Sequence, residues 1–104
     1  MIIDDIRLGE GEAVNSGDEV SVHYIGRLED GQEFDNSYEK GSAFTFRVGK
    51  GRVIDGWDQG LVGMRPGGQR VLVVPPELAY GRDGFGPIPP EATLIFAIEL
   101  ISIN

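Results

Sequence analysis

The 104-residue sequence contains no cysteine and only one histidine, His23. The lack of cysteine excludes a disulfide framework, a thiolate metal site and a cysteine nucleophile. A single histidine cannot supply a multi-histidine metal cluster, so we expect neither a metal ion nor a cofactor. The chain also lacks an apolar stretch of the roughly 18–20 residues that a membrane-spanning helix requires, so we expect no membrane partner.

Basic side chains are also few, with 9 against 17 acidic ones and a net charge of −8. The excess lies in residues 1–39, which hold 11 acidic residues but only Arg7 and Arg27 as basic ones. Because an acidic surface repels phosphates, nucleic acid and anionic membranes are poor partners. We expect the charge to keep the chain in solution as a monomer. The N-terminus has no basic region followed by an apolar one, so we expect a cytoplasmic location.

The residues that are present describe a globular, core-forming protein, with 40% hydrophobic and 25% charged residues. The length predicts a single domain, residues 1–104. Alternating or short apolar runs predict about five strands, at residues 2–8, 20–29, 44–48, 70–74 and 93–103. Asp30-Gly31 predicts a two-residue hairpin turn after the second of these strands.

One segment has the spacing of a helix instead. Its apolar residues recur at intervals of three and four, at Ile54, Trp57, Leu61 and Met64. Three glycines lie within it (Gly56, Gly60 and Gly63), and each lowers helix propensity by about 1 kcal/mol, so the helix must pack closely on another element. We therefore predict an α+β fold in which a strongly twisted antiparallel sheet of about five strands wraps around one short α-helix.

Two segments, residues 36–42 and 80–90, are predicted to be loops. The second carries Phe85 and Ile88 among glycines and prolines. Apolar residues on a loop either bind a ligand or cap the end of the core, and the pattern alone leaves both interpretations open.

The common catalytic motifs are absent. The sequence has no nucleophile elbow, no phosphate-binding P-loop and no dinucleotide fingerprint. His23 shares its strand face with Ser21 but has no orienting carboxylate, so we interpret it as a structural or surface residue. The remaining candidates are aromatic side chains, and an aromatic concavity with one carboxylate suits a small apolar group.

Six segments resemble a known family in the right order and spacing. Residues 51–61, Gly-Arg-Val-Ile-Asp-Gly-Trp-Asp-Gln-Gly-Leu, resemble the V-I-x-G-W-[DE]-x-G-[LV] core of the FKBP-type peptidyl-prolyl cis–trans isomerases. The other matching segments are residues 22–31, 34–37, 63–70, 78–81 and 88–96. The resemblance covers essentially the whole chain, and the family fold agrees with the one predicted above.

The resemblance implies a proline-binding pocket with Trp57 as its floor. Its other parts would be the walls Tyr24, Phe34, Phe46 and Phe96, the lip Val53 and Ile54, and the loop residues Tyr80, Phe85 and Ile88. Asp35 would be the lone carboxylate. Lys40 stands where some members of the family have an arginine near it, which would allow an ion pair with Asp35. The Ile54 N–H and the Tyr80 hydroxyl would donate to ligand carbonyls. Phe34, Asp35, Trp57 and Tyr80 are the residues assigned to catalysis. The loop at 80–90 is one residue shorter than the family pattern, with Pro87 in an aliphatic position.

The activity implied by the resemblance is rotation about X–Pro bonds in proline-containing polypeptides, which assists folding. Macrolide inhibitors would be further ligands. This reaction needs a dry, shaped pocket and no nucleophile, which agrees with the missing catalytic motifs. Asp35 and Tyr80 would then orient the substrate. Two alternatives are a non-catalytic module that binds proline or apolar segments in the same pocket, and a folding chaperone that uses the Phe85 loop.

Overall fold

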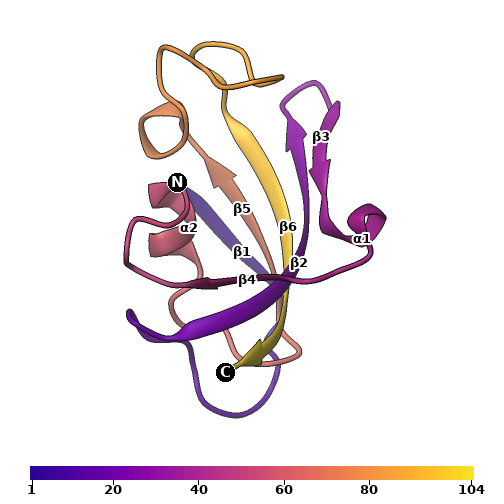
Figure 1. Cartoon of the computed structure of the whole chain (residues 1–104), viewed down its shortest axis with the longest axis vertical. Coiled ribbons are helices and arrows are strands. Elements are labelled where there is room, and N and C mark those ends of the chain that lie inside the picture. Colours follow the sequence, from indigo (N-terminus) through magenta and orange to yellow (C-terminus); the bar gives the residue numbers. More distant parts are fainter.

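The computed structural model describes all residues, 1–104, and is built on one antiparallel sheet (Figure 1). Its six strands are β1 (Ile2–Arg7), β2 (Glu19–Leu28), β3 (Glu33–Asn36), β4 (Phe44–Arg47), β5 (Gln69–Val74) and β6 (Leu94–Ile103). The strand order is β1-β5-β6-β2-β3, and β4 pairs with β2 outside this path.

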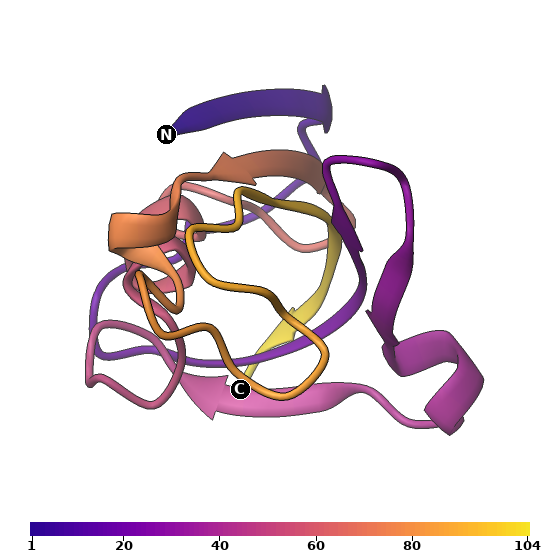
Figure 2. The same ribbon diagram turned by 90° about the horizontal axis from the view of Figure 1, so that it is seen from above.

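Strand β2 connects the two parts of the sheet. One of its edges pairs with β6 along its length. On the other edge, Glu19–Val22 pair with β4, whereas Ile25–Arg27 pair with β3. Because β3 and β4 share one edge of the same strand, the sheet turns around its concave face rather than extending flat, as the view from above shows (Figure 2).

The concave face holds the principal helix, α2 (Asp55–Gly60), which packs on β5 (Figures 1 and 2). A Cβ atom on Gly60 would lie 2.6 Å from Leu72 Cδ1, and one on Gly56 would collide with Val74. Since real side chains do not approach this closely, only glycine permits this spacing between helix and sheet. The close packing predicted from these glycines is confirmed.

The helix is shorter than the apolar spacing over residues 54–64 predicted. Gly63 has a φ of 94°, in the left-handed region, and lies in a turn beyond the helix end. Leu61 and Met64 are nevertheless buried. The apolar spacing therefore identified the residues that face the core correctly, but it overestimated the length of the helix.

The predicted fold class is confirmed, with three additions to the predicted elements. The sheet has a sixth strand, β3, and a one-turn helix α1 (Ser37–Lys40) lies where residues 36–42 were predicted to be a loop. The predicted hairpin is present, but its connection spans residues 29–32 and is longer than two residues, with Gly31 at a φ of 91°. A short 3-10 helix, η1 (Pro76–Leu78), follows β5.

The core lies between the concave face of the sheet and α2, and 16 buried hydrophobic residues form one cluster there. In β2 and β6, buried residues alternate with more exposed ones, as the period-2 pattern predicted. The 80–90 loop and the β2–β3 hairpin lie together at one end of the molecule (Figure 1). None of the helices has the length and hydropathy to span a bilayer.

Candidate active site

Trp57 is the centre of an aromatic cluster on the concave face. It lies in α2 and is only 4% exposed. Its ring meets those of Tyr24 and Phe96 edge to face, with centroids 4.9 Å and 5.2 Å away. Such edge-to-face pairs are favoured geometries that add to the burial of each ring. The indole Nε1 is buried and has no hydrogen-bond partner within the chain, so Trp57 contributes its aromatic ring as the floor.

The walls depend on a glycine in β2. Phe34 from β3 meets Phe96 from β6 edge to face, with centroids 5.7 Å apart. Gly26 lies directly behind them, because a Cβ atom there would be 2.7 Å from Phe34 Cζ and 3.0 Å from Phe96 Cε1. The absence of a side chain at this position therefore allows the two rings to form the wall.

These rings line a pocket of about 200 Å³. Its ten lining residues are Tyr24, Phe34, Asp35, Phe44, Arg52, Val53, Ile54, Trp57, Tyr80 and Phe96. They come from β2, β3, β4, α2, β6 and two connecting segments. The fold thus brings together residues up to 72 positions apart in sequence, from Tyr24 to Phe96.

The pocket contains one carboxylate, Asp35, which accepts hydrogen bonds from three groups. Tyr24 Oη donates at 2.5 Å and the Asn36 N–H at 2.9 Å, and Lys40 Nζ lies 2.7 Å away. Burial raises the pKa of Asp35, but the Lys40 and Tyr24 hydrogen bonds outweigh it, so the pKa lies below its usual value. Asp35 thus forms an ion pair with Lys40 and is anionic at neutral pH.

The two tyrosines of the pocket stay neutral at the same pH. Burial and the hydrogen bond to Asp35 raise the pKa of Tyr24 well above its ordinary range. Burial, together with the negative charge of Asp35, also raises the pKa of Tyr80. None of these three groups changes its charge near neutrality, so none is suited to move a proton there.

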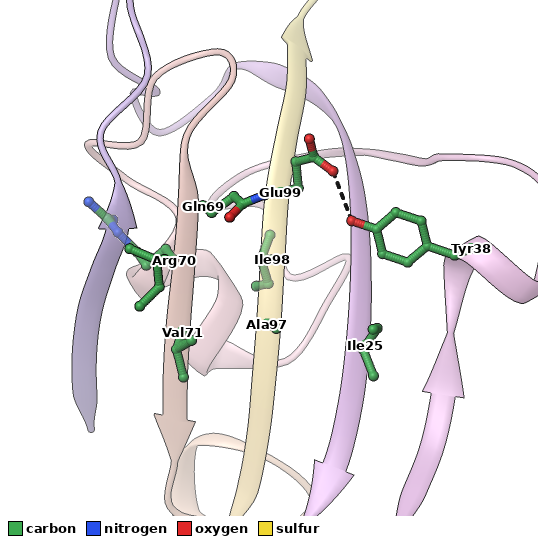
Figure 3. A pocket seen from close by; sticks show the side chains of 9 residues that line it. Ile25, Tyr38, Gln69, Arg70, Val71, Ala97, Ile98 and Glu99 are labelled. Carbon is green, nitrogen blue, oxygen red and sulfur yellow. Dashed lines mark hydrogen bonds between the residues drawn. The ribbon is translucent and has the colours of Figure 1, made fainter.

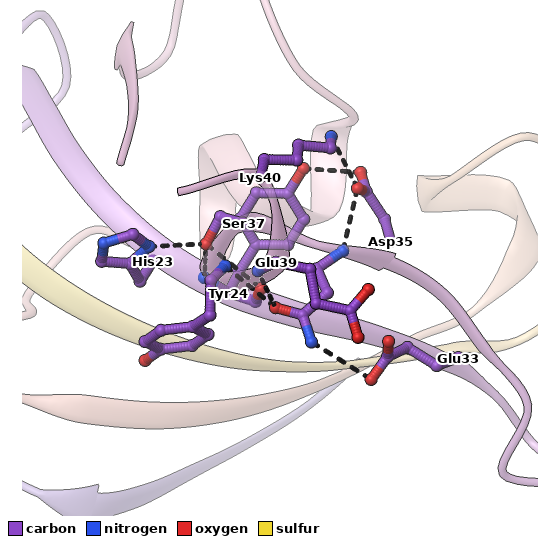
Figure 4. Close-up of polar contacts among 9 residues, drawn as sticks. His23, Tyr24, Glu33, Asp35, Ser37, Glu39 and Lys40 are labelled. Atoms are coloured by element: carbon purple, nitrogen blue, oxygen red, sulfur yellow. Dashed lines mark hydrogen bonds and ion pairs between the residues drawn. The ribbon is translucent and has the colours of Figure 1, made fainter. Parts of the chain in front are cut away.

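The segment that carries Asp35 is fixed by a second set of polar contacts (Figure 4). The buried Ser37 hydroxyl accepts a hydrogen bond from the Tyr24 N–H at 2.7 Å and lies 2.8 Å from His23 Nδ1. The His23 ring stacks on Tyr38, with centroids 4.5 Å apart. His23 thus helps to hold α1 against β2, which agrees with the structural role predicted for it.

Tyr38 also connects α1 to the outer, convex face of the sheet (Figure 3). Its hydroxyl donates to Glu99 Oε1 at 2.8 Å, and burial with this bond raises the pKa of Tyr38 to about 12. The hollow beside this bond has a volume of about 150 Å³ and is lined mainly by aliphatic side chains. Its polar lining residues include Gln69, Arg70 and Glu99. It has no aromatic floor, so the concave pocket is the better candidate for the active site.

Most of the predicted site residues meet in the pocket: Tyr24, Phe34, Asp35, Val53, Ile54, Trp57, Tyr80 and Phe96. Three predicted residues do not line it. Phe46 is buried against Trp57, at 5.6 Å between centroids, and Ile88 belongs to the core. Phe85 is 67% exposed and stacks on Tyr80 at 5.3 Å, so it extends the aromatic surface outside the pocket.

Two lining residues, Phe44 and Arg52, were not among those predicted. Phe44 shares a strand face with Phe46, and the two rings stack at 5.3 Å, so the alternation within β4 was a usable signal. The position of Arg52 depends on the loop before α2. There Asp58 accepts hydrogen bonds from the N–H groups of Gly49 and Gly51, at 2.8 Å and 3.1 Å. No sequence pattern indicated that contact.

Several hydrogen-bond donors of the lining residues have no acceptor within the chain, and the Ile54 N–H and the Tyr80 hydroxyl are two of them. The Ile54 N–H precedes the first turn of α2 and donates to no backbone or side-chain group. The hydroxyl of Tyr80, which also lines the pocket, makes no hydrogen bond within the chain. The site therefore combines an aromatic floor with donors that are available to carbonyl groups of a ligand.

Known proteins are similar to this chain in both sequence and fold. The family model of the FKBP-type peptidyl-prolyl cis–trans isomerases matches residues 10–101. An FK506-binding protein of Neisseria meningitidis is 46% identical over 104 residues, which cover 99% of this chain and 95% of that protein. The crystal structure of AtFKBP13 superposes with a TM-score of 0.93 at 43% identity, covering 98% of this chain and 91% of the other.

Some relatives are much longer than this chain. FK506-binding protein 4 of Chaetomium thermophilum is 54% identical over 104 residues. Those residues are 100% of this chain but only 21% of that protein, so the chain spans about a fifth of its length. Together with the family model, which matches most of the sequence, these similarities show that the chain belongs to the FKBP-type peptidyl-prolyl cis–trans isomerase family.

Proposed function

We propose that the chain catalyses cis–trans isomerisation of X–Pro peptide bonds and that proline binds in the concave aromatic pocket. The observation that carries this proposal is the combination of a buried aromatic floor at Trp57 with donors that have no acceptor within the chain, among them the Ile54 N–H and the Tyr80 hydroxyl. The apolar rings suit the proline ring, and the donors suit the carbonyl groups on either side of it.

The chemistry follows from amide resonance. Rotation about a peptide bond has a barrier of about 18–20 kcal/mol, because resonance gives the C–N bond partial double-bond character. The planar amide is more charge-separated than the twisted one, so removing water from its carbonyl weakens the planar form more. A pocket that binds the twisted form better than the planar form therefore accelerates rotation without breaking any bond.

The charges of the site agree with a mechanism that transfers no proton. Asp35 is held anionic by Lys40 and Tyr24, while Tyr24 and Tyr80 are held neutral. We infer that Asp35 orients Tyr24 and adds a fixed negative charge beside the pocket. Trp57 and Phe96 would contribute more to the rate, because they form the surface that the twisted amide contacts.

We infer that the ligands are proline-containing polypeptides and that macrolide inhibitors bind the same pocket. Two residues of the 80–90 loop would contribute to binding from outside the pocket lining: Phe85 from the exposed surface, and Ile88 from the core. The single core cluster supports one folding domain over residues 1–104. The monomeric state, the cytoplasmic location and a role in protein folding stay predictions.

The proposal is tested by exchange NMR on a tetrapeptide that contains one X–Pro bond. We expect catalytic amounts of the chain to raise the exchange rate above the uncatalysed value. Phe34→Ala removes one wall and is expected to reduce kcat/KM about tenfold, which corresponds to about 1.4 kcal/mol. Ile6→Ala, on the exposed face of β1, is the control and is expected to leave the rate unchanged.

The alternative binding module is distinguished in the same samples. Trp57 is the only tryptophan, so its fluorescence reports directly on ligands in the pocket. Saturable binding of the peptide with no acceleration of exchange would support a non-catalytic module and contradict the proposal.

A further inference from the structure

Arg52 is the only cation among the residues that line the aromatic pocket. It also lines the neighbouring hollow formed by β4, together with Phe44 and Arg47. Arg52 therefore borders both the aromatic pocket and the adjoining hollow. The inference that follows rests on the isomerase function proposed above.

The guanidinium of Arg52 has no partner within the chain. Several other cations are paired: Lys40 with Asp35, Arg47 with Glu19, Arg27 with Glu33, and Arg70 with Asp5. Arg52 makes neither an ion pair nor a side-chain hydrogen bond, although acidic residues outnumber basic ones almost two to one. An exposed, unpaired arginine at the rim of a binding pocket is available to an anionic group of the ligand.

The carboxylates of Asp35 and Asp58 already have hydrogen-bond partners within the chain. Asp35 is bonded to Lys40 and Tyr24 on the β3 side of the pocket. Asp58 accepts hydrogen bonds from Gly49 and Gly51 and so braces the loop on which Arg52 stands. The backbone that presents Arg52 is therefore held by hydrogen bonds, and Glu19, the carboxylate that lines the adjoining hollow with Arg52, is paired with Arg47.

We propose that Arg52 is a specificity-determining residue that favours substrates with an acidic side chain next to the proline. The net charge of −8 repels acidic peptides in general, so the preference must arise locally, where Arg52 lies. An ion pair of this exposed kind changes kcat/KM by about two- to fivefold. Because such a pair is screened, the preference decreases as salt is added.

The test compares tetrapeptides that carry Glu, Gln or Lys immediately before the proline, and a second set that carries them immediately after it. The wild-type chain is expected to prefer Glu to Gln about two- to fivefold at one of these positions in low salt, and to lose the preference at about 1 M salt, where the Debye length is about 3 Å. Arg52→Gln abolishes the preference, and Arg52→Glu transfers it to the Lys peptide.

The matched control is Arg7→Gln in β1. This substitution changes the net charge by the same amount, but Arg7 does not line the pocket. It is expected to retain the full Glu preference. The inference would be overturned if the ratio of kcat/KM for the Glu peptide to that for the Gln peptide were the same in the wild type and in Arg52→Gln at both positions. The Gln peptides would in that case still report isomerase activity. A loss of turnover of every peptide by the wild-type chain would instead contradict the proposed function.

Discussion

Replacing Gly26 by alanine tests the wall of the pocket with a single methyl group. The new Cβ atom would lie 2.7 Å from Phe34 Cζ and 3.0 Å from Phe96 Cε1, so at least one ring must move. Phe96 is 4% exposed and tightly packed, whereas Phe34 is only partly buried. We therefore expect Phe34 to be displaced towards the pocket, where it would occupy part of the space that a proline ring needs.

The change in the free energy of unfolding caused by Gly26→Ala combines two opposing effects. Gly26 does not have a positive φ, so alanine fits its backbone and removes the cost of about 0.5–1 kcal/mol that glycine carries in a strand. Overpacking costs about 1–3 kcal/mol. The net loss in the free energy of unfolding is then about 0–2.5 kcal/mol, whereas kcat/KM is expected to fall about tenfold or more, since one wall of the pocket is misplaced.

The measurements are urea unfolding and kcat/KM by exchange NMR for Gly26→Ala, Phe34→Leu and the double variant. Because Phe34→Leu removes the ring atom that meets the new methyl group, Gly26→Ala should cost less stability in that background. An unchanged kcat/KM in Gly26→Ala would refute the reasoning. So would strictly additive stability effects, because they would show that the two side chains do not meet.

Three further variants test the contacts around the site. Asp35→Asn should lower stability less at pH 3 than at pH 7. Folding lowers the pKa of Asp35, so its contribution is fully present above the unfolded-state pKa and decreases as the pH falls towards and through the folded-state value. Equal losses at both pH values in urea unfolding would contradict this. Ser37→Ala should cost about 1–3 kcal/mol of unfolding free energy, because it leaves the buried Tyr24 N–H without its acceptor, and a loss below about 0.5 kcal/mol would show that water replaces the hydroxyl. Gly60→Ala should lower the thermal midpoint despite its better helix propensity, because its methyl group would lie 2.6 Å from Leu72 Cδ1; a raised midpoint would contradict the close packing of α2 on β5.

The long strands were predictable from the sequence because their burial alternates with period two. The pattern around Val20, Val22 and Tyr24 gave the correct face of β2, and the helical spacing around Trp57 gave the buried face of α2. The end of α2 was placed too late because Gly63 has a left-handed φ, which apolar spacing does not report.

The short elements beside the pocket were not predictable in the same way. Strand β3, Glu33–Asn36, has only one apolar residue, Phe34, so it shows no alternation, and it is defined by its pairing with β2. Helix α1 follows Asn36, whose side chain accepts from the N–H groups of Tyr38 and Glu39. That cap was a local signal, but the burial of Ser37 depends on its tertiary contact with Tyr24.

The candidate site likewise has residues that could be predicted from the sequence and others whose positions depend on tertiary packing. The resemblance indicated eight of the ten lining residues, because its motifs fix their spacing in sequence. It did not separate the lining residues from those one layer away: Phe46 lies behind the pocket, Ile88 lies in the core, and Phe85 is exposed beside Tyr80. These differences depend on side-chain packing, and the function of each residue stays a prediction.

The central claim is that the pocket accelerates X–Pro rotation through shape and dryness, without proton transfer. The most direct test is the catalysed exchange rate of one X–Pro tetrapeptide, measured by NMR between pH 5 and 8 and repeated in D₂O. The account predicts a clear acceleration that is nearly constant over this range and nearly equal in H₂O and D₂O. No acceleration, or a rate that follows a titration curve and falls several-fold in D₂O, would contradict it.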